Sequence, residues 1–181
     1  MQKSTGQLHN SWHSFSKYRP LIRELVTRDL KVKYRRSFLG YVWSILNPLL
    51  MMLLQTLVFS YMFRFQIENF PLYLICGNTL FNFFNESTNM GMGSVLGNSS
   101  LIKKVYVPKF IFPISRVVSS FVNLLFSLAA IILVMLITRS PFHLTILLVW
   151  APLVLLFLFT CGIALLLSAL AVYFRDLQYL Y

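Results

Sequence analysis

The sequence has few acidic residues and little charge of any kind. Five of its 181 residues are Asp or Glu, 12% are charged and 57% are hydrophobic. Soluble domains have about 25% charged and about 45–50% apolar residues, so this composition excludes a soluble globular domain. The two cysteines, Cys76 and Cys161, both lie in apolar stretches. They exclude a disulfide framework and a four-cysteine zinc site.

Motifs of catalysis and of nucleotide binding are also missing. The sequence contains no His-Glu-x-x-His, no Gly-x-Ser-x-Gly, no paired carboxylates and no Gly-x-x-x-x-Gly-Lys-Ser/Thr loop. His9 and His13 stand four residues apart, but two histidines without a third ligand make a weak metal site. We therefore predict no enzyme, no bound metal and no cofactor, and a partner must supply the energy for any work.

The basic residues are concentrated near the N-terminus. Of sixteen Lys and Arg residues, nine lie within the first 36 residues, ahead of the first long apolar run. A net charge of +11 would suit a nucleic-acid partner only on a surface free of such runs. The pattern is instead typical of the cytoplasmic flank of a membrane span, and no nucleic acid is predicted.

Long apolar runs predict an all-α polytopic protein of the bacterial cytoplasmic membrane. A spanning helix needs about 20 apolar residues, and three runs meet this length. A fourth segment, 72–95, is more polar, but counting it as a span puts 14 basic residues inside and 2 outside, against 10 and 6 without it. The positive-inside rule thus favours four spans with a cytoplasmic N-terminus. They lie at about 39–63, 72–95, 113–137 and 144–173.

The segment before the first span divides into two parts. Residues 1–19 are predicted to be a polar cytoplasmic tail without fixed structure, and 20–37 an amphipathic helix at the membrane interface. Asp29 interrupts the apolar arc of this helix, and Lys33, four residues later, is its predicted partner. A basic flank that only orients the first span is the alternative. The candidate residues of the interface helix, some of which could form a gate, are Arg28, Asp29, Lys31, Lys33, Tyr34 and Arg35.

Polar side chains recur at helical spacing in the first two spans. Amides that faced lipid would lack partners, so they must face other helices or an aqueous path. The sequence leaves open whether they serve helix packing or line a channel. Glu86 is the only acidic residue within a span, and Asn82 could satisfy it locally. The candidate residues are Asn47, Gln55, Asn78, Asn82, Asn85, Glu86 and Asn89.

The loop between the second and third spans carries its own candidate site. Pro108 and Pro113 predict a short helix at about 99–107, followed by a turn before the third span. The helix would present an apolar knob with a basic side to a cytoplasmic partner. A solvated positive loop that only sets topology is the alternative. The candidate coupling residues are Leu101, Ile102, Lys103, Lys104, Val105, Tyr106 and Lys109.

Three motifs carry a resemblance to a known family. They are RDLKVKYRRSFLGYVWSILNP at 28–48, LIKKVYVPKFIFPISR at 101–116 and YFRDL at 173–177. Together they resemble the membrane subunit of ABC-2 type polysaccharide exporters, which move lipid-linked O-antigen or teichoic acid, over about residues 20–181. The resemblance implies a homodimeric permease that forms a channel for a lipid-linked polysaccharide and pairs with two ATPase subunits. It also implies an interface helix at the N-terminus and a coupling helix in the inner loop.

Members of this family have six spans, and the last two follow the YFRDL motif. The resemblance therefore implies that the transmembrane domain, residues 38–181, is incomplete at its C-terminal end. Two rival functions remain open. One is an ABC-2 drug or antibiotic exporter, and the other is a membrane scaffold of a glycan-assembly complex that transports nothing.

Overall fold

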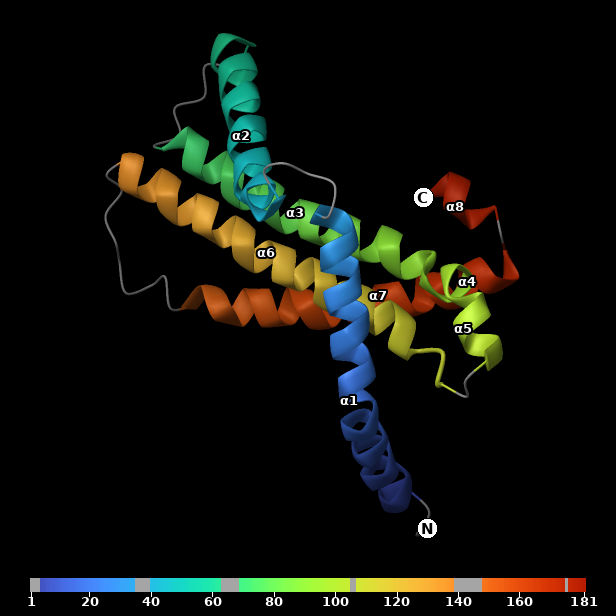
Figure 1. The fold of residues 1–181 in the computed structure, drawn as a ribbon. Coiled ribbons are helices and arrows are strands. Elements are labelled where there is room, and N and C mark those ends of the chain that lie inside the picture. The colour runs from blue at the N-terminus through green and yellow to red at the C-terminus, as the bar shows by residue number, and fades with distance from the viewer. Residues whose placement is uncertain (1–3, 35–39, 63–68, 105–106, 139–147, 175) are drawn as a thin grey trace.

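The computed structural model of the chain is built from helices (Figure 1) and describes residues 4–34, 40–62, 69–104, 107–138, 148–174 and 176–181. No β-strand occurs among these residues, which agrees with the predicted all-α class. The long helices are α1 (Ser4–Tyr34), α2 (Trp43–Met62), α3 (Phe70–Met92), α6 (Ile111–Ile137) and α7 (Trp150–Tyr173). The short ones are η1 (Gly40–Val42), α4 (Ser94–Gly97), α5 (Ser99–Lys104) and α8 (Leu177–Leu180).

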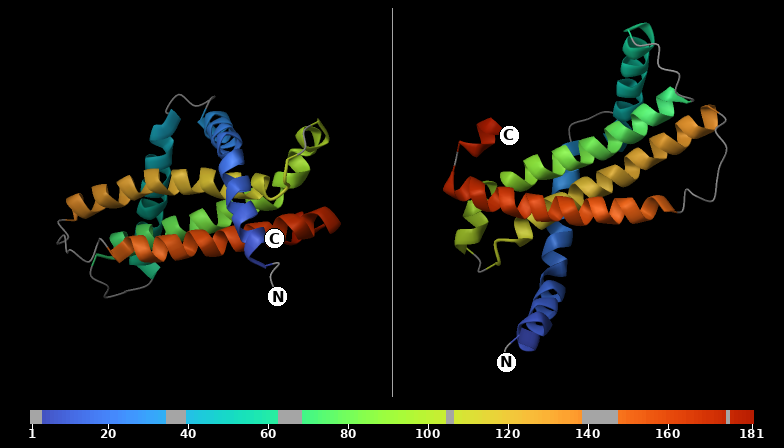
Figure 2. Two further views of the ribbon diagram at one scale, coloured as in Figure 1. Left: turned by 90° about the horizontal axis from the view of Figure 1, so that it is seen from below. Right: turned by 180° about the vertical axis from the view of Figure 1, so that it is seen from behind.

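Three of the long helices form one layer. Helices α3, α6 and α7 each contact the other two, and they lie next to one another in Figure 1. Helices α1 and α2 cross one face of this layer, so that both pass behind it when the molecule is viewed from the opposite side (Figure 2). Helix α1 contacts α6, and α2 contacts α3 and α6. Helix α6 is therefore the element against which all the other long helices pack.

The helix boundaries follow from local sequence. Helix α3 begins after Asn69, whose φ of 54° is in the left-handed region that Asn tolerates, and Pro71 lies in its first turn. Helix α6 begins at Ile111, with Pro113 in its first turn, where the missing N–H costs nothing. The predicted break between the inner-loop helix and the third span is confirmed, since α5 ends at Lys104.

Among the described helices, two are long and apolar enough to cross a membrane, namely α6 and α7. Helix α2 contains a shorter apolar segment, Trp43–Phe59. The described residues are thus helical and include two helices of spanning length, while the four-span count stays a prediction. The four predicted spans each coincide with one long helix, namely α2, α3, α6 and α7 in that order.

The prediction for the N-terminal segment was wrong in one respect. We expected an unstructured tail to residue 19 and a helix from Pro20, whereas α1 begins at Ser4 and contains Pro20. A proline inside a helix removes one backbone hydrogen bond and crowds the preceding turn, but it does not always end the helix. The polar residues before Pro20 have ordinary helix propensities and continue the helix toward the N-terminus.

Close packing within the layer depends on small and aromatic side chains. Gly91 of α3 faces α7 so closely that an added Cβ would lie 2.8 Å from Ala164 Cβ. Phe121 of α6 packs edge-on against Phe83 and Phe157, with ring centroids 5.8 and 4.9 Å apart. These contacts hold α3, α6 and α7 together without polar bonds.

Candidate functional site

Helix α1 packs on the start of α6 through an apolar cluster. Ile22 and Leu25 of α1 are buried against Ile111 and Phe112 of α6. These α1 residues belong to the predicted apolar arc, whose spacing of three and four residues places them on one side of the helix. The cluster brings the polar residues that follow in α1 onto the face of α6.

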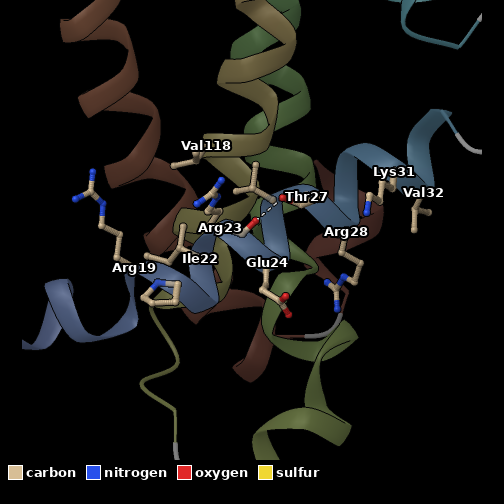
Figure 3. Close-up of a pocket in the computed structure, with 11 residues that line it drawn as sticks. Arg19, Ile22, Arg23, Glu24, Thr27, Arg28, Lys31, Val32 and Val118 are labelled. Atoms are coloured by element: carbon tan, nitrogen blue, oxygen red, sulfur yellow. Dashed lines mark hydrogen bonds between the residues drawn. The ribbon is translucent and has the colours of Figure 1, made fainter.

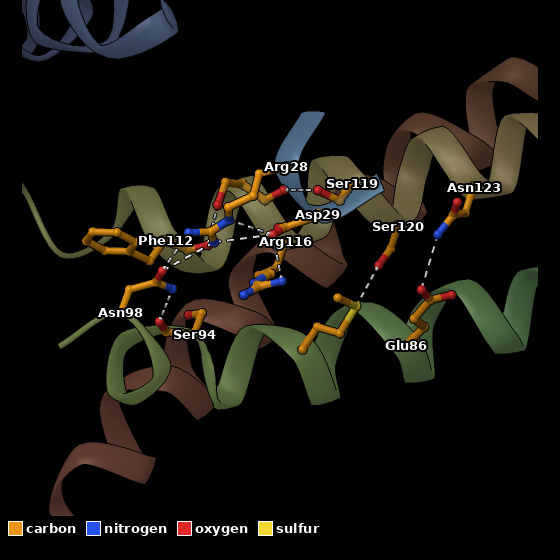
Figure 4. A network of polar contacts seen from close by, with 12 residues as sticks. Arg28, Asp29, Glu86, Ser94, Asn98, Phe112, Arg116, Ser119, Ser120 and Asn123 are labelled. Carbon is orange, nitrogen blue, oxygen red and sulfur yellow. Dashed lines mark hydrogen bonds and ion pairs between the residues drawn. The ribbon is translucent and has the colours of Figure 1, made fainter. Parts of the chain in front are cut away.

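Asp29 forms a buried ion pair one turn further along α1. Its Oδ1 lies 2.9 Å from Arg116 Nη1 of α6 and 3.2 Å from Arg28 Nη2, and its side chain is 4% exposed (Figure 4). The predicted partner Lys33 was wrong. Lys33 is one turn away on the same helix, but the packing of α1 on α6 places the Arg116 guanidinium against the carboxylate instead.

Arg28 links this ion pair to the junction between α4 and α5. Its guanidinium donates to Asn98 Oδ1 from Nη1 and Nη2, at 3.3 and 3.2 Å. Asn98 is buried between α4 and α5 and donates to the Ser94 carbonyl at 2.8 Å (Figure 4). One connected network thus links α1, the α4–α5 junction and α6. A shift of α1 would either break these bonds or move the bonded residues of the other elements with it.

Lys33 pairs instead with Glu86 of α3. The Nζ–Oε1 distance is 2.6 Å, and the side chains are 41% and 31% exposed. Asn123 of α6 donates to the same Oε1 at 3.2 Å (Figure 4). The alternative that Asn82 satisfies Glu86 locally does not hold in the structure, because the carboxylate bonds to Lys33 of α1 and Asn123 of α6 instead.

The asparagine stripe of α3, formed by Asn78, Asn82, Asn85 and Asn89, serves more than one purpose. Asn78 donates to Gln55 Oε1 of α2, which is an interhelical packing contact. Asn89 donates to the carbonyl and side-chain oxygens of Asn85, at 2.9 and 2.8 Å, within α3. Asn82 and Asn85 are exposed and line a cavity. The packing and aqueous-path interpretations therefore each fit part of the stripe.

The cavity lies between α2, α3 and α6 and has a volume of about 390 Å³. Its polar lining consists of amides, hydroxyls and the Lys33–Glu86 ion pair, and Trp43 and Phe83 add aromatic surface. Four of the candidate residues predicted in the first two spans contribute, namely Asn47, Asn82, Asn85 and Glu86. Concave sites of about 300–1,000 Å³ are typical of small-ligand pockets.

A second, open groove follows the outer face of α1. It has a volume of about 1370 Å³ and presents the basic side chains of the predicted interface helix, with Glu24 among them (Figure 3). Val118 of α6 forms part of its wall. The basic residues that line it are Arg19, Arg23, Arg28 and Lys31. Such a helix, with one apolar and one basic face, suits a membrane interface.

The inner-loop helix α5 turns part of its apolar side toward the protein. Leu101 and Ile102 are half-buried and pack against the apolar cluster of α1 and α6. Lys103, Lys104 and Lys109 are exposed. Two residues of the expected apolar knob, Leu101 and Ile102, therefore pack against α1 and α6, and the exposed side of α5 is basic. Val105, Tyr106 and Arg35 lie outside the described residues, and Tyr34 is the last residue of α1.

Two important partners were not among the predicted site residues. They are Arg116, which pairs with Asp29, and Asn123, which donates to Glu86. A signal was available, because Arg116 is the one basic residue in the third apolar run and Asp29 the one acid in the apolar arc of 20–37. Opposite charges in apolar settings are expected to pair.

The described residues contain no group of three or more His, Cys, Asp or Glu side chains that could hold a metal ion. The two cysteines are free and half-buried. The polar groups of the site therefore offer hydrogen bonds and ion pairs across helices, which can position helices or receive a polar ligand.

Comparison with known proteins agrees with the sequence motifs. The family model described as ABC-2 type transporter matches residues 20–181. The chain is 36% identical over 167 residues to the O-antigen export system permease protein RfbA of Myxococcus xanthus, covering 90% of this chain and 63% of that protein. It is 32% identical over 161 residues to RfbA of Klebsiella pneumoniae, covering 87% and 61%.

A more distant relative is the polysialic acid transport protein KpsM of Escherichia coli, with 27% identity over 167 residues, 87% of this chain and 62% of that protein. The chain thus spans somewhat less than two thirds of the length of these relatives. The family match nevertheless includes the docked part of α1, the α5 loop and all the helices of the layer. This chain is an integral membrane protein that belongs to the ABC-2 type transporter family.

Proposed function

We propose that the chain is the membrane permease subunit of an exporter that moves a lipid-linked polysaccharide, of O-antigen or teichoic acid type, across the cytoplasmic membrane. The observation that carries this proposal is the similarity to O-antigen export permeases over 87–90% of the chain. A separate ATPase would supply the energy, since neither a nucleotide-binding loop nor a catalytic motif is present in the sequence.

The proposed topology has four spans, α2, α3, α6 and α7, with the N-terminus in the cytoplasm. Helix α2 has 20 residues, which corresponds to about 30 Å of helix, the thickness of a hydrocarbon core. Helix α3 carries amides, but Asn78 donates to Gln55 of α2, and Asn82 and Asn85 line the cavity rather than facing lipid in this proposal. Basic residues then accumulate on the side of α1 and α5, as the positive-inside rule requires.

Coupling to the ATPase would use the exposed basic side of α5. Lys103 and Lys104 point away from the apolar cluster that holds Leu101 and Ile102. Two permease copies with two ATPase copies would place one such contact on each ATPase. Asn98, beside α5, is bonded to Arg28 of α1. A displacement of α5 by the ATPase would therefore be transmitted to α1 through the hydrogen bonds and ion pairs around Asp29.

The first test is deletion of the gene that encodes the chain. We expect surface polysaccharide to disappear and lipid-linked polysaccharide to accumulate in the cytoplasmic fraction, as measured by immunoblotting of both fractions. Restoration by a plasmid copy is the control. Unchanged surface polysaccharide would contradict the proposal, and a change only in sensitivity to drugs would identify a drug exporter instead.

The second test addresses the partner. Lys103→Glu combined with Lys104→Glu should abolish co-purification of the co-expressed ATPase, because the reversed charges would repel an acidic docking surface. Lys17→Glu, in the polar N-terminal part, is the matched control and should co-purify the ATPase normally. Equal amounts of ATPase with all variants would rule out a coupling role for the two lysines.

A further inference from the structure

The cavity between α2, α3 and α6 contains a polar group that the fold leaves without a partner. Thr79 lines it, is 4% exposed, and its Oγ1 has no hydrogen-bond partner among the described residues. Thr88 and Thr160, in contrast, donate to a carbonyl of their own helix, at 2.8 and 2.7 Å. A buried hydroxyl without a partner is unfavourable unless a ligand or water supplies the bond.

Amides line the cavity together with Thr79. Asn47 and Asn82 offer both N–H donors and an acceptor oxygen, and Asn85 offers its N–H donors, since its oxygen accepts from Asn89. Sugar hydroxyls also donate and accept, so the two kinds of group match. Trp43, which is 45% exposed, adds a flat aromatic surface on which the apolar face of a sugar ring can pack.

The charge of the cavity also selects among sugars. The described residues that line it include one cation and one anion, Lys33 and Glu86, and these form an ion pair at 2.6 Å. The net charge of this lining is therefore close to zero. An anionic sugar would have to compete with the Glu86 carboxylate for the Lys33 ammonium group, and its own carboxylate would lie near that of Glu86.

We propose that this cavity binds a short segment of a neutral, hydroxyl-rich sugar chain, with Thr79 and the neighbouring amides bonding its hydroxyls and Trp43 packing on a ring. This inference rests on the proposed export function and adds the charge class of the sugar. The volume of about 390 Å³ lies in the range of small-ligand sites, so the cavity would hold a few sugar units rather than a whole polymer.

The test measures protection of a cysteine placed in the cavity wall. Met51 lines the cavity and is 49% exposed, so Met51→Cys, in a background with Cys76→Ser and Cys161→Ser, reports access without removing a proposed hydrogen-bonding group. The exporter complex in membrane vesicles is reacted with N-ethylmaleimide, alone or with maltotriose, mannotriose or the anionic trisaccharide of sialic acid. We expect the neutral trisaccharides to slow the reaction in a saturable way, and the anionic one to leave it unchanged.

Two threonine variants then locate the binding. Thr79→Val should raise the protecting concentration of neutral trisaccharide about fivefold, the change expected for one lost hydrogen bond. Thr56→Val is the matched control, because Thr56 Oγ1 is also buried without a partner but does not line the cavity. It should leave the protecting concentration unchanged. Equal membrane amounts and equal co-purified ATPase verify that each variant folds.

Three outcomes would overturn the inference. The first is a thiol in the Met51→Cys variant that reacts with N-ethylmaleimide but that no neutral trisaccharide protects, which would mean that the cavity holds water only. The second is equal protection by the neutral and the anionic trisaccharides, and the third is equal effects of Thr79→Val and Thr56→Val. None of these outcomes changes the result expected from the gene deletion. Failure of the sugar site and failure of the proposed export function can therefore be distinguished.

Discussion

Helices α1 and α7 contact their neighbouring helices in opposite ways. The buried residues of α1 include Asp29, which bonds to another helix through the Arg116 ion pair. The buried hydroxyls of α7, Thr160 and Ser168, donate to carbonyls of α7 itself, at 2.7 and 2.9 Å. Helix α7 instead meets α3 through the close contact of Gly91 with Ala164.

This difference has a physical origin. Within lipid, apolar helix surfaces gain little by leaving one apolar medium for another, so shape decides how α7 packs. A charge buried between helices is costly unless it is paired. The ion pairs of α1 therefore fix which of its faces packs on the neighbouring helices and at which position along α6 it lies. Attachment of α1 should therefore be sensitive to charge, and attachment of α7 to volume.

The largest effect is expected from Asp29→Leu. It leaves the Arg116 guanidinium, which is 22% exposed, facing a leucine, and removing one partner of a buried pair costs about 3–5 kcal/mol. We expect that loss in the free energy of unfolding, measured in mixed micelles, together with loss of export. Glu24→Leu, an exposed acid of the same helix, is the matched control and should change little.

Adding Arg116→Leu to Asp29→Leu sharpens this result. The double variant removes both charges and should regain most of the lost stability, because an apolar pair often replaces a buried ion pair without penalty. Export should nevertheless stay impaired if the Arg28–Asn98 link needs Asp29 to orient Arg28. A double variant as unstable as the single one would show that the pairing is not the cause.

Gly91→Ala tests the packing of α7. The new Cβ would lie 2.8 Å from Ala164 Cβ, and overpacking of this kind typically costs about 1–3 kcal/mol. The control is Gly77→Ala in the same helix, where no atom lies within 4 Å, and it should stabilise α3 by up to about 1 kcal/mol. A thermal unfolding midpoint that moves equally in both variants would contradict close packing at Gly91.

A smaller effect is expected from Glu86→Gln. The change keeps an acceptor for Asn123 and removes the charge that pairs with Lys33. Because both side chains are partly exposed, the pair should be worth about 0.5–1 kcal/mol. A double-mutant cycle with Lys33→Met measures it, and a coupling energy of zero would mean that the ion pair does not help to hold α1.

The smallest effect concerns the contact between Asn78 and Gln55. Hydrogen bonds between membrane helices average about 0.6 kcal/mol in double-mutant cycles, and we expect that coupling for Asn78→Leu with Gln55→Leu. Asn82→Leu with Gln55→Leu is the control cycle, since Asn82 faces the cavity, and it should give no coupling. Equal coupling in both cycles would mean that the stripe acts as one packing surface.

Some of this arrangement could be predicted from the sequence. Apolar run length located α2, α6 and α7, the distribution of basic residues added α3, and the prolines at 108 and 113 located the break before α6. The spacing of the asparagines placed them on one side of α3. The three motifs indicated the family. These features depend on residues close together in the chain, whose helical geometry is nearly independent of the rest of the fold.

The choice of partners could not be predicted in this way. Asp29 pairs with Arg116 rather than with Lys33, and Lys33 pairs with Glu86, 53 residues away. The apolar side chains Leu101 and Ile102 turn toward α1 and α6. Helical periodicity determines which side chains share a face, but the neighbour of that face depends on how the helices cross, and only the packing of α1 and α3 on α6 decides it.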